Sequence, residues 1–207
     1  MHNTTQMEIN GLYCGFNMPV ALSESAHAQG LPPYAPQPVH KVDEYNSPDG
    51  WMHGSGKASS YFVAVRAGCG MWLDFTANAS HKHHVAVLVS IQGVNPITGQ
   101  KQIGFGLQQH RENCPKHNVA FGQDRYCPEC KYKWPPQNYL ATTGGHSLWI
   151  DGFRNDQGEV RQYVFTEETA RGVAAQIIGA ERVFAIGVAF YLSVDEKPQP
   201  KYATRGG

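Results

Sequence analysis

Two short pairs of metal-binding residue types lie close together in this sequence. Cys114 and His117 are separated by two residues, as are Cys127 and Cys130, and nine residues lie between the pairs. Two intervening residues allow one tight turn to present both side chains to the same ion, so two such turns supply four tetrahedral ligands. We expect one structural Zn²⁺ per chain at these positions, with His110 as an alternative ligand.

The second pair lies in the run CPECKYKW, which resembles the knuckle of zinc ribbons and rubredoxin-like sites. The resemblance implies a Cys-Pro-x-Cys turn that aims backbone N–H groups at the sulfurs, followed by an aromatic residue. It covers residues 114–130 only, and no family is indicated for the whole chain. His117 stands where most ribbons have a fourth cysteine, which favours zinc over iron. Because four protein ligands leave no position for water or substrate, the expected metal is structural rather than catalytic.

A nucleic-acid-binding role is an alternative for the segment from His110 to Lys133. It has five basic and three acidic side chains, and Tyr126, Tyr132 and Trp134 could stack on bases. Affinity for nucleic acid comes mainly from basic surface, which is thin here. The competing interpretation is that the aromatic residues pack around the metal.

The other residues whose side chains could take part in catalysis or metal binding do not form a catalytic pattern. His81 and His83 share one face of an extended chain and could bind a metal, but a solvated loop at the start of a strand is the favoured interpretation, because no carboxylate or cysteine neighbours them in the sequence. Cys69 lies in a glycine-flanked turn and is expected to be a buried thiol. Asp74 and Asp151 could pair, but they belong to different predicted hairpins. Since no phosphate-binding loop, G-x-S-x-G or H-E-x-x-H motif is present, we expect no enzymatic activity.

The composition limits the remaining function classes. The 207 residues include 17 basic and 17 acidic side chains, so no overall field attracts nucleic acid or anionic lipid. The N-terminus lacks the features of a signal peptide, and the longest apolar run, RVFAIGVAFYLS, is too short to span a bilayer. We therefore expect a cytoplasmic protein or a component of a virion or other intracellular particle, with its five cysteines serving as ligands and core thiols.

Strand-like segments dominate the middle of the chain. Aromatic and β-branched runs separated by turn residues predict one strand around Ile9–Phe16, and a hairpin or a bulged strand formed by residues 60–68 and 70–77. Two further hairpins would join residues 83–94 to 101–109 and 147–154 to 159–166. A helix is expected from Thr166, a suitable N-cap, to Gly179. This pattern predicts a mainly β, antiparallel sandwich or jelly-roll-like domain with one helix and an inserted zinc-stapled loop.

The predicted organisation has three parts. Residues 1–58 contain the N-terminal strand and a proline-rich arm, residues 59–194 the β-rich core with the zinc-binding insertion at 110–146, and residues 195–207 a polar tail. The arm at 27–50 and the tail offer little apolar surface with which to order themselves, so we expect them to contact neighbouring subunits. The terminal Arg-Gly-Gly resembles the tail of ubiquitin-like modifiers, but the rest of the chain does not look like their fold.

Two function classes follow from these observations. The first is a structural, self-assembling protein, such as a subunit of a filament, cage, tail or shell, that forms a homo-oligomer through the arm and tail. The second is a zinc-containing module that binds nucleic acid or a protein partner.

Overall fold

The chain is mainly β with antiparallel sheets, as the sequence predicts. The computed structural model describes residues 6–9, 12–19, 36–46, 53–56, 58–77, 84–110, 112–142, 147–155, 157–166 and 185–193. In these segments every pair of neighbouring strands is antiparallel. None of the helices found there is long and apolar enough to cross a membrane.

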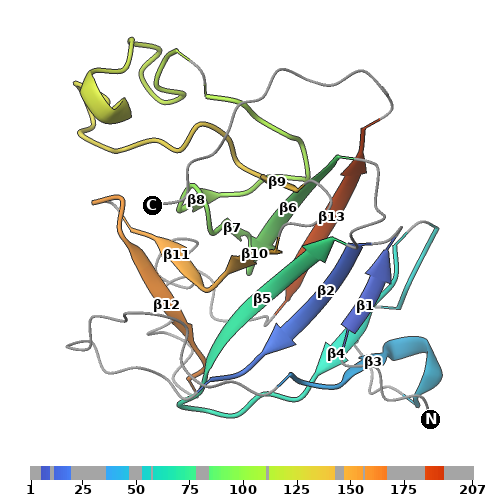
Figure 1. Ribbon diagram of the computed structural model, residues 1–207. Helices are drawn as coiled ribbons and strands as arrows, with labels where there is room; N and C mark the ends of the chain where they lie inside the picture. The colour runs from blue at the N-terminus through green and yellow to red at the C-terminus, as the bar shows by residue number, and fades with distance from the viewer. Residues whose placement is uncertain are drawn as a thin grey trace.

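The first sheet is built around one long strand (Figure 1). Its members are β1 (Gln6–Ile9), β2 (Leu12–Asn17), β5 (Gly70–Ala77), β10 (Ser147–Ile150), β11 (Gly152–Arg154) and β12 (Val160–Val164). Strand β5 pairs with β2 along one edge, while β10 and β12 share its other edge. Only Asp151 separates β10 from β11, so the chain turns there from β5 to pair with β12.

The second sheet is arranged around β6 in the same way. It contains β6 (Val85–Ile91), β7 (Val94–Asn95), β8 (Gln100–Lys101), β9 (Leu140–Thr142) and β13 (Ile186–Leu192). Strand β13 pairs with the whole length of β6, and β9 and β7 share the opposite edge. A small third sheet joins β3 (Val39–Lys41) to β4 (Tyr61–Val63), with a short 3-10 helix, η1 (Val42–Glu44), between them.

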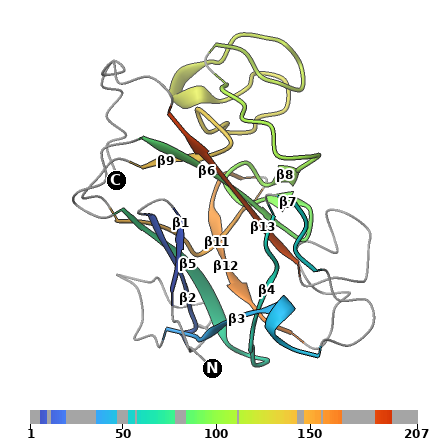
Figure 2. The same cartoon turned by 90° about the vertical axis from the view of Figure 1, so that its right-hand side faces the viewer.

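The two larger sheets face each other across a common apolar core (Figure 2). Alternate side chains of each strand enter this core, which is the pattern expected when one face of an antiparallel sheet is buried. The contributing residues are Leu12, Cys14 and Phe16 of β2, Met71, Leu73 and Phe75 of β5, and Val85, Val87, Val89 and Ile91 of β6. Ile186, Val188 and Phe190 of β13 pack against this core and are only partly buried.

The predicted hairpins have mixed outcomes. The hairpin at residues 147–166 is confirmed, since Phe153 of β11 lies opposite Arg161 of β12. The hairpin that joins 60–68 to 70–77 is wrong, because β4 pairs with β3 and β5 pairs with β2, β10 and β12. In the region 83–109, the long hairpin is replaced by a short one, in which Asn95 of β7 faces Gln100 of β8. These strands pair with partners that are distant in sequence, because side-chain packing between strands in the core stabilises the fold more than local turn preferences do.

The ends of the chain are described in part. The predicted N-terminal strand is a hairpin of two strands, β1 and β2. The described part of the arm, residues 36–46, packs on this same domain, because Val39 and Val42 are buried. The predicted helix after Thr166 and the tail at 195–207 lie outside the described residues, as do His81, His83 and the terminal Arg-Gly-Gly.

Candidate metal centre

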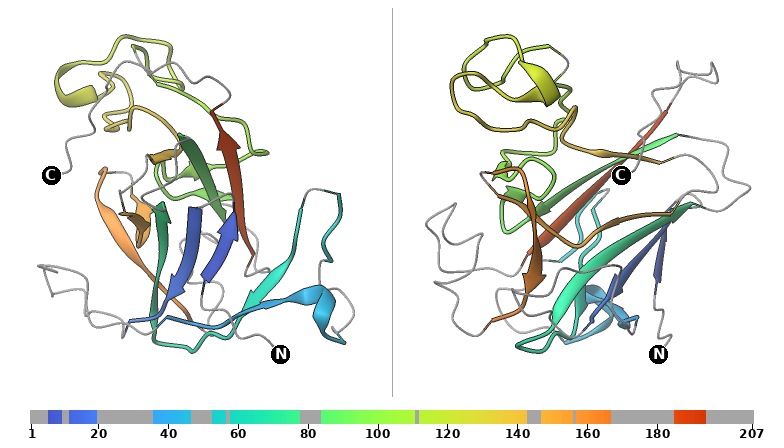
Figure 3. Two further views of the ribbon diagram at one scale, coloured as in Figure 1. Left: turned by 45° about the vertical axis from the view of Figure 1, so that its right-hand side comes forward. Right: turned by 60° about the vertical axis from the view of Figure 1, so that its left-hand side comes forward.

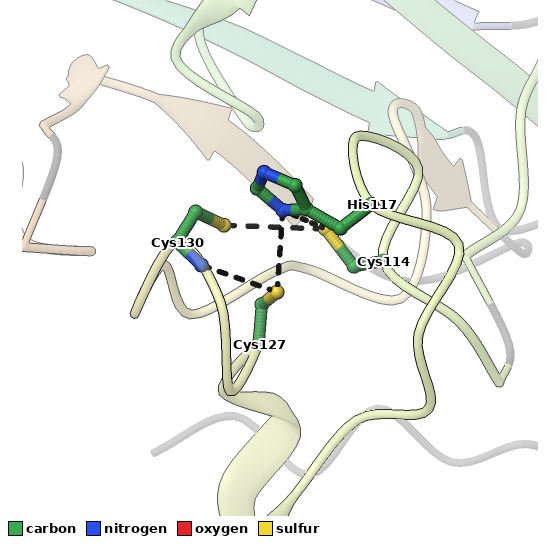
Figure 4. A group of neighbouring side chains, drawn as sticks. All are labelled: Cys114, His117, Cys127 and Cys130. Carbon is green, nitrogen blue, oxygen red and sulfur yellow. Dashed lines mark hydrogen bonds between the residues drawn. The ribbon is translucent and has the colours of Figure 1, made fainter.

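Four predicted ligands meet in the long insertion between β8 and β9. Their ligand atoms all lie within 4.8 Å of one another. The Nδ1 atom of His117 is 3.7 Å from the sulfur of Cys114 and 3.5 Å from that of Cys127, and the sulfurs of Cys114 and Cys130 are 4.0 Å apart. Figure 4 shows the four side chains converging from two turns. This Cys₃His group could hold a metal ion, as the spacing in the sequence predicts.

Each turn is built in the same way. In the first, the backbone N–H of Cys114 donates to Val119 O at 2.8 Å, and the N–H of Asn118 donates back to Cys114 O at 2.8 Å. In the second, the N–H of Cys127 donates to Tyr132 O at 3.0 Å, and the N–H of Lys131 donates back to Cys127 O at 2.9 Å.

The repeat extends to backbone conformation and side-chain type. Asn118 and Lys131, four residues after the first cysteine of each turn, both have left-handed backbone with φ of 52° and 57°. The runs CPKHNV and CPECKY therefore encode one structural unit twice, thirteen residues apart. This internal repeat is visible in the sequence and was missed there. The signal is the shared Cys-Pro, the second ligand three positions after the cysteine, and Val119 or Tyr132 two positions after that ligand.

The environment of the sulfurs suits a cation. Burial raises the pKa of Cys127, but hydrogen bonds from the backbone N–H groups of Cys130 and Glu129, together with the Cys114 and His117 side chains, lower it to about 6. Burial raises the pKa of Cys114. Without a cation, one thiolate beside other sulfurs opposes ionisation of the next. A divalent ion removes this conflict, because three thiolates and an imidazole then share its charge.

A small apolar cluster surrounds the four ligands. Tyr132 and Trp134 are buried beside Cys114 and Cys127, with the rings of Tyr132 and Trp134 edge to face at 4.9 Å. Val119 and Phe121 cover part of this cluster. We call residues 112–134 the knuckle module; its cluster has no residue in common with the sandwich core. Figure 3 shows the module beyond the second sheet, away from β1, β2 and β5.

Arg125 links the two ends of the insertion by hydrogen bonds. Its guanidinium donates to Trp134 O at 2.9 Å and to the carbonyl oxygens of His110 and Pro135. The same group lies 4.5 Å from the centre of the Phe121 ring. Because one fixed cation satisfies carbonyls from both ends of the insertion, it holds those ends together.

Two buried asparagines anchor the insertion to the sandwich. The Asn138 side chain accepts a hydrogen bond from Gln108 N at 2.8 Å and donates to Gly106 O at 3.0 Å. Asn95 donates to Asn138 O at 2.7 Å, while its own oxygen accepts from the N–H groups of Ile97 and Thr98. In both side chains the amide nitrogen donates and the amide oxygen accepts. The sequence analysis missed them, and no local signal marks them, because their partners lie up to 43 residues away.

Tyr132 and Gly99 form a second contact between module and sandwich. The hydroxyl of Tyr132 donates to the carbonyl of Thr98 in the β7–β8 turn. Gly99 follows with φ of 63°, and a Cβ at this position would lie 2.1 Å from Arg154 O. Only glycine fits here, so the turn can approach both the module and β11.

The other candidates do not assemble into a site. His110 is buried against Trp134, with ring centres 5.4 Å apart, and is not part of the ligand group. Burial and the charge of Arg125 lower its pKa. Cys69 is buried, as expected. Asp74 accepts a hydrogen bond from Thr76 and lies opposite Trp149, and within the described segments no group of metal-binding side chains includes it or Asp151.

The aromatic residues that could stack on bases are unequally placed. Tyr132 and Trp134 are buried in the module, whereas Tyr126 is 43% exposed and has the Lys133 ammonium 5.7 Å from its ring centre. Arg125 is engaged with carbonyl oxygens. These positions favour the interpretation that the aromatic residues pack around the metal site.

Comparison of the chain with protein-family models, with curated proteins and with solved structures found no match.

Proposed function

We propose that the chain is a structural, self-associating subunit whose knuckle module is held by one Zn²⁺. The donor set supports zinc, because three sulfurs and one imidazole in a closed group of four are typical of structural zinc sites. Four protein ligands leave no position for an activated water, so we expect no catalysis at the metal. The metal's role is then to fold a module whose own apolar cluster is small.

The observation that carries the proposal of self-association is the edge strand β13. It pairs only with β6 among the described residues, and its sequence, IGVAFYL, contains no charge and no proline. Its core-facing residues are only half-buried, and Tyr191 and Leu192 are exposed. An open, apolar edge strand of seven residues is a template for pairing with another chain.

The other edge strands of the two larger sheets, β1, β11 and β8, are better protected against pairing with another chain. Strand β1 carries Glu8, β11 carries Arg154 and β8 carries Lys101, and these strands have four, three and two residues. Short length and charge are the usual means by which proteins prevent edge-to-edge association. Strand β13 has neither, which supports a partner at this edge.

The hydrogen-bond pattern predicts which groups face that partner. Ser193 N donates to His84 O and Gln92 N donates to Ala185 O, so the odd-numbered residues of β13 are those that bond to β6. Since the pattern alternates, the N–H and C=O groups of Ile186, Val188, Phe190 and Leu192 point to the open edge.

A second copy fits this edge best. In an antiparallel, two-fold pairing centred on Ala189, all seven residues overlap and the outward groups of Val188 meet those of Phe190 in the other copy. Because the strand is uncharged, self-pairing brings no like charges together. The tail at 195–207 follows β13 almost directly in sequence, and we propose that it and the arm extend the same interface.

Mass measurement by light scattering after size exclusion tests the interface. In the two-fold register, Ala189→Glu places two carboxylates directly opposite each other, and it should convert an oligomer into a monomer. The matched control is Ala141→Glu, at the exposed position of β9 on the other side of β6 from β13, and it should leave the mass unchanged. Leu192→Lys is a second disrupting variant, at an exposed position.

Two results would overturn the proposal. One is a wild-type protein that is monomeric at about 100 μM, well above the range of stable association. The other is an oligomer whose mass survives both Ala189→Glu and Leu192→Lys. Either would favour the alternative of a zinc-containing binding module.

A further inference from the structure

A pocket of about 240 Å³ lies between the knuckle module and the β7–β8 hairpin. Pro115, Lys116 and Trp134 contribute the module side, and Thr98 and residues 100–103 contribute the hairpin side. Figure 1 shows these two parts next to each other at one end of the second sheet. None of the four metal ligands and no residue of β13 lines the pocket, so it is separate from both sites, although Trp134 also belongs to the apolar cluster beside the ligands.

The charged side chains that line the pocket are both positive. Lys101 and Lys116 line it from opposite sides, and both are exposed at its rim. Among the described residues that line it there is no aspartate or glutamate. Two ammonium groups without a neighbouring carboxylate favour a ligand with negative charge.

Two buried nitrogen atoms in the pocket wall have no partner. His110 and Trp134 both line the pocket and are 6% and 4% exposed. The Nε2 atom of His110 and the Nε1 atom of Trp134 find no hydrogen-bond partner among the described residues. Buried polar groups are nearly always paired, and an orphaned pair in one wall indicates a missing partner.

Two further polar side chains of the wall, Gln102 and Asn138, already have hydrogen-bond partners. Gln102 accepts from Asn95 and donates to Gly104 O, and Asn138 uses its amide on Gln108 and Gly106. The strongest groups offered to a ligand are the indole N–H, the His110 ring nitrogen and the two ammonium groups. An indole can only donate, and ammonium groups can only donate, so the occupant must accept hydrogen bonds.

We propose that this pocket binds a small organic carboxylate. A carboxylate has two oxygens that accept several hydrogen bonds, which matches the indole N–H of Trp134, His110 in its Nε2–H tautomer and the two flanking ammonium groups. The volume lies just below the usual range for ligand sites, so the ligand is a small acid rather than a nucleotide. Because the module provides one wall, the site exists only in the metal-loaded protein.

The indole N–H of Trp134 is a direct reporter for this site. Zinc-loaded, ¹⁵N-labelled protein is titrated with acetate, succinate and inorganic phosphate at constant ionic strength, with sodium chloride as the reference. We expect saturable shifts of the Trp134 indole resonance with the carboxylates, at dissociation constants below about 10 mM. The resonance is assigned by its absence in Trp134→Phe.

Matched lysine variants separate binding from general charge effects. Lys101→Gln and Lys116→Gln should each weaken succinate binding about threefold to tenfold. Lys131→Gln, in the same module but not in the pocket wall, should leave binding unchanged. The three variants can be compared because each removes one exposed charge.

Several outcomes would overturn the proposal. They are the absence of a saturable shift with either carboxylate, an equal shift with sodium chloride, or equal losses in Lys116→Gln and Lys131→Gln. Tighter binding of phosphate than of succinate would also reject a carboxylate site. None of these results depends on the oligomeric state, so the test of this pocket is independent of the test of β13.

Discussion

Replacement of one metal ligand should separate the knuckle module from the sandwich. Cys127→Ser exchanges a buried sulfur that contacts His117 and accepts a hydrogen bond from Cys130 N for a harder, poorer zinc ligand. Structural zinc sites contribute about 10–16 kcal/mol of binding free energy, and a quarter of that is about 3 kcal/mol per ligand. We therefore expect zinc affinity to fall by about a hundredfold or more.

The loss should unfold the module and leave the sandwich folded. The module cluster contains four buried residues, whereas the sandwich core contains fifteen and shares none of them. Four buried residues cannot offset the conformational entropy of the module's 23 positions, about 1 kcal/mol or more for each backbone residue. The fifteen-residue core is built from strands that lie outside the insertion, so its stability should change little.

Competition with a chromophoric chelator measures the affinity, and hydrogen exchange measures the local unfolding. In Cys127→Ser, the amides of Asn118 and Lys131 should lose protection, because they donate to the carbonyls that close the two turns. The amides of β6 should keep theirs. Cys69→Ser is the control, since Cys69 is buried away from the ligand group. Unchanged zinc affinity, or loss of protection throughout β6, would refute the reasoning.

Two further predictions concern packing and thiol chemistry. Gly99→Ala should lower the free energy of unfolding by roughly 2–4 kcal/mol, because its Cβ would collide with Arg154 O and its backbone is left-handed. Gly104→Ala is the control: its backbone is also left-handed, but beyond its chain neighbours no atom of the described residues lies within 4 Å of the added Cβ. It should lower the free energy of unfolding, measured in urea, by only about 1 kcal/mol. An equal loss in both would show that the collision is absent. Burial, with a smaller effect from Asp74, raises the pKa of Cys14 to about 12. Its thiol therefore stays protonated at pH 8 and should react with iodoacetamide only after the protein is denatured. Mass spectrometry of the labelled peptides would measure this reaction. Rapid labelling of Cys14 in the native protein would contradict its burial.

The sequence by itself determined the local features of this protein. A Cys-Pro-x-ligand turn is closed by hydrogen bonds over four or five residues, so its spacing alone located all four members of the candidate metal group. The same is true of strand content, because alternating apolar residues such as Val85, Val87 and Val89 can bury one face only in an extended chain. The mainly β class followed from these runs, and β13 was visible as an uncharged apolar segment.

Only the tertiary structure decided which strands meet. Strand β5 pairs with β2 rather than with its neighbour β4, because pairing partners are chosen by the packing of side chains far apart in sequence. The same holds for three other features: the open edge of β13, the hydrogen bond from Asn95 to Asn138 O, and the pocket between the module and the hairpin. A hydrogen bond or a cavity between distant segments has no local signature, since its free energy depends on groups that become neighbours only after the chain has folded.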